Sequence, residues 1–208
     1  VAAAESGRPG PVHLCVPGDV LRASVKEDDA ARWLAEAENR PAAGGASAAL
    51  TATTPRSAAD PDLVREAVDI LAHAQRPLLV AGSGVYYAAA EEPLRRLAAA
   101  VAAPVVIPIW DRGSVSRPMA EYLGVIGAAS GGAELLADAD TIVLAGARVD
   151  YRVDYLQPPA IAAKARVIRI DGEPGALNQG VLPHVGLLGD PAVVLAQLRD
   201  EWQRRHLP

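Results

Sequence analysis

The segment Gly146-Ala-Arg148-Val-Asp150-Tyr-Arg152-Val-Asp154 carries the densest group of charged side chains that could do chemistry. Its two guanidinium groups, Arg148 and Arg152, could fork onto phosphate oxygens, and the carboxylate of Asp150 could orient one of them. The alternative is a solvated loop whose charges pair with one another, which would contribute about 1 kcal/mol or less to stability. The sequence leaves both interpretations open.

A second candidate site is the glycine turn Gly82-Ser83-Gly84. It follows the apolar run 78–81 directly, and a helical pattern begins soon after it. Glycine lets the backbone approach a ligand closely, and N–H groups at a helix start attract anions. A strand, a glycine turn and a helix form the first half of a nucleotide-binding crossover. An ordinary tight turn is the alternative.

A dehydrogenase of the nicotinamide-dependent type is a less favoured interpretation of the same turn. Its fingerprint needs a third glycine or alanine, and here that position holds Tyr87. The ring would hinder close packing of the helix on the strand. Asp111 is only a weak candidate for the carboxylate that binds a ribose.

No complete catalytic or metal-binding group is evident in the sequence. The four histidines have no metal-ligand spacing, no serine lies in a G-x-S-x-G elbow, and Cys15 has no base beside it. We therefore expect neither catalytic nor metal-ligating residues in this chain.

Composition excludes several classes of partner. The net charge is -5 and the isoelectric point is near 5.4, without a lysine or arginine cluster, which argues against nucleic acid. No apolar run reaches the ~18 residues of a membrane span, so we expect no membrane partner. A single cysteine excludes an internal disulfide and fits a reducing compartment, so we expect a cytoplasmic protein.

Alternating strands and helices must position these polar segments. Helix patterns cover 60–74, 91–103 and 131–139, another helix ends at 161–165, and a last one is capped by Asp190. Apolar runs predict six strands, at 77–81, 104–108, 123–126, 141–145, 166–170 and 185–188. This alternation predicts an α/β fold, a doubly wound six-stranded parallel sheet with helices on both faces. Ligands of such sheets bind beyond the carboxyl ends of the strands.

The chain before Asp60 is less regular. Val12–Val16 is predicted as one short strand between prolines, and 26–40 has a weak helical pattern. Small and polar residues without a period at 41–59 indicate a linker. We therefore divide the chain into 1–25, a linking region 26–59 and a compact domain 60–208.

Five segments together resemble the central domain of thiamine-diphosphate-dependent enzymes of the acetolactate synthase group. They are Gly7–Val20, Arg76–Gly84, Ala139–Arg152 with its "ADxxxxxGxRxDxR" pattern, Val167–Pro174, which resembles a "VIxIDxDP" pattern with Glu173 at its second Asp, and the final Gly189-Asp190. The resemblance follows the chain in order over nearly its whole length.

The resemblance implies a six-stranded, Rossmann-like domain that binds FAD in some relatives, ADP in others and nothing in the rest. Residues 1–25 would then be the tail end of a preceding pyrimidine-binding domain. The implied nucleotide contacts are Gly82, Ser83, Gly84, Gly146, Arg148, Asp150, Arg152, Asp171 for the adenosine ribose, and Asp190 near the flavin end.

The resemblance also implies a parent enzyme, a transferase or lyase that uses thiamine diphosphate and Mg2+ and is a homo-oligomer. The family's activating glutamate and its Gly-Asp-Gly…Asn motif are not found in residues 1–208. We therefore expect flanking pyrimidine- and diphosphate-binding domains in the parent chain and an inert isolated chain. A spacer domain without ligand is the alternative.

Overall fold

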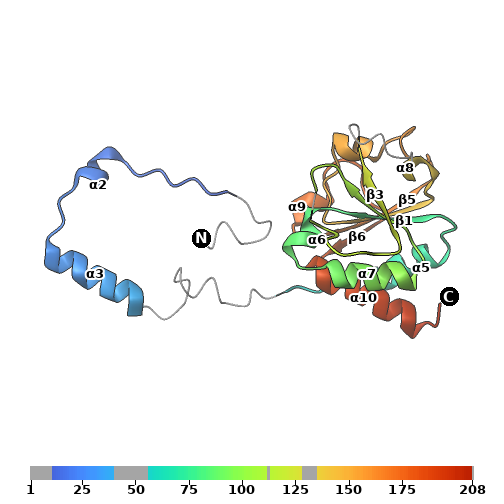
Figure 1. Cartoon of the computed structure of the whole chain (residues 1–208), viewed down its shortest axis with the longest axis horizontal. Coiled ribbons are helices and arrows are strands. Elements are labelled where there is room, and N and C mark those ends of the chain that lie inside the picture. The colour runs from blue at the N-terminus through green and yellow to red at the C-terminus, as the bar shows by residue number, and fades with distance from the viewer. Residues whose placement is uncertain (1–10, 40–55, 112, 128–134, 208) are drawn as a thin grey trace. The chain divides into compact units, whose positions relative to one another are not determined.

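The computed structural model describes residues 11–39, 56–111, 113–127 and 135–207. The chain divides into two compact units, Val1–Pro55 and Arg56–Pro208. Figure 1 shows the strands and most of the helices in the second unit. Among the described residues, no helix is both long enough and apolar enough to cross a membrane.

In the first unit the structure describes two helices, α2 (Gly18–Arg22) and α3 (Glu27–Asn39). The helical pattern predicted at 26–40 is thus confirmed. The strand predicted at Val12–Val16 is wrong, because residues 11–17 have no regular secondary structure. A strand needs hydrogen bonds to a neighbouring strand, and no described residue supplies them to this segment. Its apolar side chains, such as Leu14, are exposed.

The second unit is built on a six-stranded sheet in which every neighbouring pair is parallel. Its strands are β1 (Pro77–Ala81), β2 (Val105–Pro108), β3 (Tyr122–Ile126), β4 (Thr141–Ala145), β5 (Arg166–Asp171) and β6 (Val185–Leu188). They lie in the order β3-β2-β1-β4-β5-β6. The predicted doubly wound sheet is confirmed, and β1 and β4 lie at its centre, where the strand order reverses.

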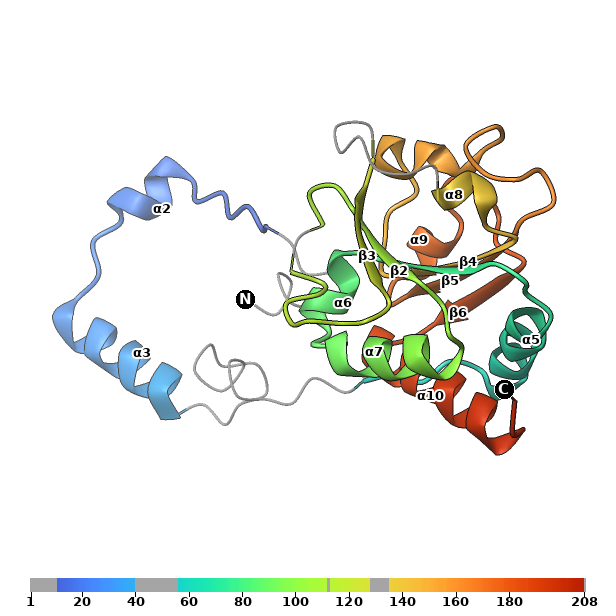
Figure 2. The same ribbon diagram turned by 45° about the vertical axis from the view of Figure 1, so that its right-hand side comes forward.

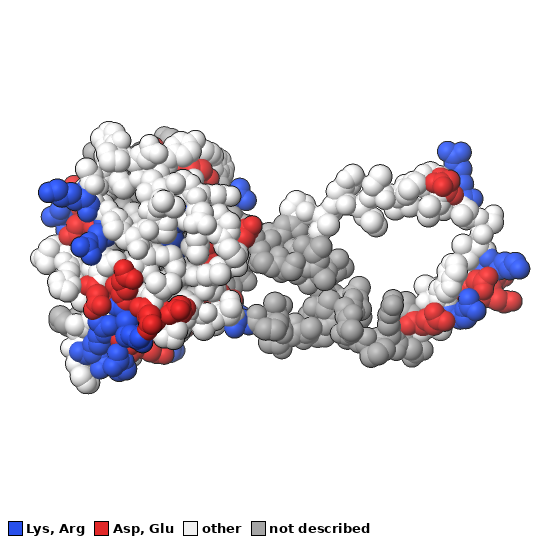
Figure 3. Space-filling view, turned by 180° about the vertical axis from the view of Figure 1, so that it is seen from behind, with Lys and Arg blue, Asp and Glu red and all other residues white. Residues whose placement is uncertain are grey.

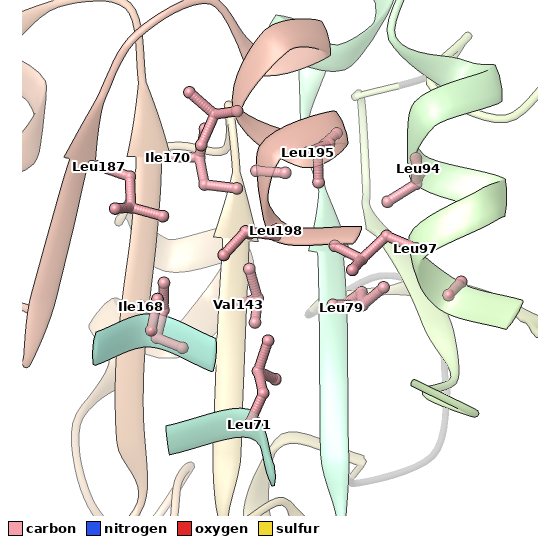
Figure 4. Close-up of a cluster of buried hydrophobic side chains, with 14 of the residues drawn as sticks. Leu71, Leu79, Leu94, Leu97, Val143, Ile168, Ile170, Leu187, Leu195 and Leu198 are labelled. Atoms are coloured by element: carbon pink, nitrogen blue, oxygen red, sulfur yellow. The ribbon is translucent and has the colours of Figure 1, made fainter. Parts of the chain in front are cut away.

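Side chains of the central strands alternate between two hydrophobic cores. Leu79, Val143 and Ile168 belong to the larger core, which Leu71, Leu94, Leu97, Leu195 and Leu198 complete from the helices (Figure 4). Leu78 and Val80 point to the second core on the other face. Because both faces are buried, these strands are continuous apolar runs without polar alternation.

Helices cover both faces of the sheet. α5 (Pro61–Ala72), α7 (Glu91–Ala100) and α10 (Pro191–Arg204) cover the larger core, and α8 (Leu135–Asp138) lies on the opposite side (Figure 2). α5 and α10 begin as predicted, because Asp60 and Asp190 accept hydrogen bonds from backbone N–H groups of the first turn. The part of the predicted helix 131–139 before Leu135 lies outside the described residues.

Three short elements of the second unit were not predicted: α6 (Ser83–Tyr87), the 3-10 segment η1 (Tyr151–Leu156) and α9 (Pro174–Leu177). The helix end predicted at 161–165 is wrong, since this segment forms turns. Its apolar residues Ile161 and Ala165 are buried in the second core, and this burial produced the helix-like pattern. Pro158 and Pro159 lack N–H groups, which disfavours a helix leading into this segment.

Candidate functional site

The candidate residues lie in loops that follow the carboxyl ends of four strands. Gly82, Ser83 and Gly84 follow β1, and Asp190 follows β6. Gly146, Arg148, Asp150 and Arg152 follow β4, while Asp171 ends β5. The carboxyl ends of parallel strands share one edge of the sheet, which is the edge where such folds bind ligands.

The glycine turn packs directly against the turn after β4. A Cβ atom on Gly84 would lie 2.6 Å from the Cα atom of Gly146, and a Cβ on Gly82 would collide with the backbone of Ala147. The N–H of Gly82 donates to the Ala145 carbonyl at 2.9 Å, and the N–H of Gly84 donates to the Gly146 carbonyl at 3.0 Å. These glycines therefore hold the two central strand ends together, and both of these N–H groups are already used.

A buried polar network connects the loops that follow β1, β2 and β4. The hydroxyl of Ser83 donates to Oδ1 of Asp111, and Nη1 of Arg152 donates to the same oxygen at 2.9 Å. The side chains of Arg152 and Asp111 are only 11% and 8% exposed. Ser114 adds a link, because its hydroxyl donates to the Gly82 carbonyl at 2.7 Å.

Arg152 also forms a forked ion pair within its own loop. Nε and Nη2 of Arg152 donate to the two carboxylate oxygens of Asp150, both at 2.9 Å. Burial raises the pKa of Asp150, but the hydrogen bonds and charge of Arg152 outweigh it, so this pKa lies below its ordinary value. The hydrogen bond to Asp150 likewise raises the pKa of Arg152 above its ordinary value, against the effect of burial.

Arg148 differs from Arg152 in its surroundings. Its side chain is exposed, and among the residues that the structure describes it has no hydrogen-bond or ion-pair partner. It acts on Asp150 only through its charge. Of the two guanidinium groups singled out from the sequence, Arg148 is thus the one available to a ligand.

The loop that carries Arg148 is supported by the segment after α9. A Cβ atom on Gly180, whose φ is +75°, would lie 2.6 Å from Cγ1 of Val149. The buried Arg169 of β5 holds this segment, donating to the carbonyls of Leu177 at 3.2 Å and Gln179 at 2.5 Å. Burial lowers the pKa of Arg169.

The two remaining carboxylates make other contacts. Oδ1 of Asp190 accepts hydrogen bonds from the N–H groups of Ala192 and Val193 and lies 3.6 Å from Nη1 of Arg56, so Asp190 caps α10. Oδ1 of Asp171 accepts from the N–H of Glu173 at 3.0 Å. Neither carboxylate belongs to the polar network around Arg152.

Two members of the network, Asp111 and Ser114, were not among the predicted site residues. The sequence alone makes Asp111 a weak candidate for a ribose ligand, yet its place directly after a buried strand is a usable signal of a site residue. Tyr87 also differs from expectation: its ring is exposed and lies edge-on to Tyr86 at 5.4 Å, so it does not obstruct the packing of the helix.

Charges and metal-ligand groups do not suggest another site. Figure 3 shows acidic and basic side chains intermixed on the face of the second unit that is turned away from the viewer in Figure 1. Ion pairs within this unit include Arg205–Glu201 and Arg95–Glu92. Within the described residues, no group of three or more His, Cys, Asp or Glu side chains could hold a metal ion.

The strand order defines a doubly wound, Rossmann-like α/β domain whose polar loops lie at one edge of the sheet. Residues 64–198 match the family model "Thiamine pyrophosphate enzyme, central domain", and the chain belongs to this family. The resemblance noted from the sequence is thus confirmed.

Relatives agree with this assignment. The chain is 32% identical over 206 residues to the acetolactate synthase isozyme 2 large subunit of Escherichia coli (strain K12), covering 96% of this chain and 34% of that protein. It is 30% identical over 199 residues to the oxalyl-CoA decarboxylase of the same strain, covering 94% and 32%. The chain therefore spans about a third of the length of the curated relatives it matches.

A solved structure shares the fold. A putative thiamin diphosphate-dependent enzyme from Mycobacterium smegmatis superimposes with a TM-score of 0.62 at 22% identity, covering 72% of this chain and 29% of that one.

Proposed function

We propose that the chain is the nucleotide-binding central domain of a thiamine-diphosphate-dependent enzyme, and that its carboxyl edge holds the diphosphate of ADP or FAD. The observation that carries this proposal is Arg148, an exposed guanidinium group at the edge where doubly wound sheets bind ligands. A guanidinium matches phosphate oxygens in both charge and geometry.

The residues at this edge fit such a group chemically. Arg148 supplies the cation, and the carboxylate of Asp171 at the end of β5 suits ribose hydroxyls. Bound ADP would supply an anchoring diphosphate, and bound FAD would add a redox-active ring. The N–H groups of Gly82 and Gly84 are excluded as phosphate donors, because they bond to the chain's own carbonyls.

The whole protein, in this proposal, is a cytoplasmic homo-oligomeric transferase or lyase. Thiamine diphosphate and Mg2+ would bind to flanking domains, with residues 1–25 closing the first of them and 26–59 leading to the central domain. Acetolactate synthase and oxalyl-CoA decarboxylase among the relatives support an enzyme of this class.

Calorimetric titration with ADP, FAD and adenosine tests the nucleotide site. We expect ADP and FAD to bind more tightly than adenosine. Since a hydrogen bond to a charged group contributes roughly 1.5–3 kcal/mol, Arg148→Ala should weaken ADP binding by about ten- to a hundredfold without changing the melting temperature. Arg166→Ala, which removes an exposed arginine at the start of β5, is the matched control and should leave binding unchanged.

Two results would count against the site. If wild type does not bind ADP or FAD at millimolar concentration, a spacer domain becomes the better description of this chain. If ADP binds but Arg148→Ala binds it equally well, the ligand lies elsewhere.

We also propose that the isolated chain is catalytically inert, since thiamine diphosphate chemistry needs groups that residues 1–208 do not carry in recognisable motifs. Purified chain supplied with thiamine diphosphate, Mg2+ and pyruvate should release no carbon dioxide above the protein-free blank. Turnover would refute this part of the proposal.

A further inference from the structure

Arg152 lies where the carboxyl ends of four neighbouring strands meet. Its guanidinium contacts Asp111 in the loop after β2, and Asp111 in turn accepts from Ser83 after β1. Asp150 belongs to its own loop after β4. Gly127 follows β3, and a Cβ atom there would lie 3.2 Å from the Arg152 carbonyl oxygen.

The backbone around Arg152 is fixed as well. Its N–H donates to Oδ1 of Asp150 at 3.0 Å, which closes a tight turn. Val153 and Leu156, which follow in η1, are both fully buried in the second core. The guanidinium therefore reaches the network from a backbone that packing holds in place.

All three nitrogen atoms of the Arg152 guanidinium are engaged with carboxylates. Nε and Nη2 bond to Asp150, and Nη1 bonds to Asp111. Such charge-assisted forks, here partly shielded from water, are strong and geometrically specific. A phosphate could bind the Arg152 guanidinium only by displacing a carboxylate from it. The exposed Arg148 can bind a phosphate without losing such an ion pair.

We propose that Arg152 is a positioning residue rather than a ligand of the phosphate. It clamps the loops after β1, β2 and β4 in one arrangement through Asp111 and Asp150, and so presents Arg148 to the diphosphate. This inference rests on the proposed nucleotide site for its binding test, while a ligand-free measurement tests the clamp by itself.

In Asp111→Ala, loss of the negative charge and loss of the clamp are expected to change ADP affinity in opposite directions. Removing a negative charge beside an anion site should tighten ADP binding if electrostatics alone decides. If Asp111 is part of the clamp, ADP binding should instead weaken by about tenfold, measured by calorimetry. Glu92→Ala, which removes an equally charged group paired to Arg95 and Arg96 on α7, is the matched control and should leave binding unchanged.

Arg152→Lys, alone and combined with Asp111→Ala, separates positioning from direct contact. Lysine keeps the charge and can bind phosphate, but its ammonium cannot bridge two carboxylates as the planar fork does. The clamp predicts that Arg152→Lys weakens ADP binding as much as Asp111→Ala does, and that the double variant is no weaker than either. Unchanged or tighter binding in Asp111→Ala, or near wild-type binding in Arg152→Lys, would overturn the proposal.

The ligand-free arm uses Trp110, an exposed residue next to Asp111. In protein labelled with 5-fluorotryptophan, fluorine NMR resolves Trp33, Trp110 and Trp202, each assigned by its Trp→Phe variant. Arg152→Lys should shift or broaden the Trp110 signal and leave that of Trp202, in α10, unchanged. An unmoved Trp110 signal would overturn the clamp whether or not ADP binds. If wild type does not bind ADP, the proposed nucleotide site is wrong, but the clamp formed by Arg152 is not affected by that result.

Discussion

At the scale of single residues, the glycine turn shows that one sequence pattern is compatible with two different structural roles. From the sequence, Gly82 and Gly84 are expected to make room for a ligand. In the structure the room is filled by the backbone of Gly146 and Ala147, which approaches too closely for any side chain. The sequence could not distinguish these cases, because the neighbour lies more than 60 residues away along the chain.

This contact makes Gly84→Ala a stability variant rather than a selective binding variant. Overpacking against a backbone that cannot move aside should cost about 1–3 kcal/mol, seen as a lower midpoint in denaturant. Gly172→Ala is the matched control, because its Cβ would meet nothing closer than the Gly189 carbonyl at 3.8 Å. If Gly84→Ala and Gly172→Ala were equally stable, the close approach of the two turns would be wrong.

The charged segment 146–154 illustrates the same limit. The sequence left open whether its arginines bind phosphate or pair internally. The structure separates them, since Arg152 is paired and largely buried while Arg148 is exposed. The pairing of Arg152 depends on Asp111, which lies 41 residues away in the sequence. The parallel pairing of the strands brings these two residues together, and a local pattern cannot show that.

At the scale of elements, the six strands and the two long capped helices could be predicted because their signals are local. Strands buried on both faces are apolar runs, and Asp-Pro pairs start α5 and α10. The short elements α6, α9 and η1 escaped prediction, because each has at most six residues and is held by its neighbours rather than by its own pattern.

The end of α10 should make stability depend on pH in the acid range. The hydrogen bond from Arg204, helped by the one from Arg205, lowers the pKa of Glu201 from 4.5 to about 2, although burial acts in the opposite direction. A carboxyl group with a lower pKa in the folded state stabilises above its unfolded pKa and loses this contribution as pH falls toward the folded pKa. Glu201→Gln should therefore lower the melting temperature at pH 7, and its difference from wild type should shrink between about pH 4.5 and 2.

Thermal melts followed by circular dichroism across this pH range measure the effect. Glu66→Gln on α5 is a suitable control, because Glu66 is exposed and has no ion pair among the described residues. Glu66→Gln should differ little from wild type in melting temperature at every pH. A constant difference for Glu201→Gln down to pH 2 would contradict the role of its ion pairs.

At the scale of the whole molecule, the fold and the family agree, and the chain accounts for about a third of its relatives' length. Residues 56–59 belong to the second unit, since the side chain of Gln197 bonds to both the N–H and the carbonyl of Ala59. The sequence did not predict a substrate, because in the proposed enzyme the catalytic groups belong to the flanking domains.

The most direct test of the account is a map of backbone amide shifts during titration of nitrogen-15-labelled chain with ADP. We predict saturable shifts in the loops at the carboxyl edge, above all at 146–152 and 171–173, with smaller ones at 82–84. Residues at the amino ends of the same strands, such as Leu78 and Ile142, should not move. Shifts confined to those amino ends or to α5 and α10, or no shifts at millimolar ADP, would contradict a nucleotide site at this edge.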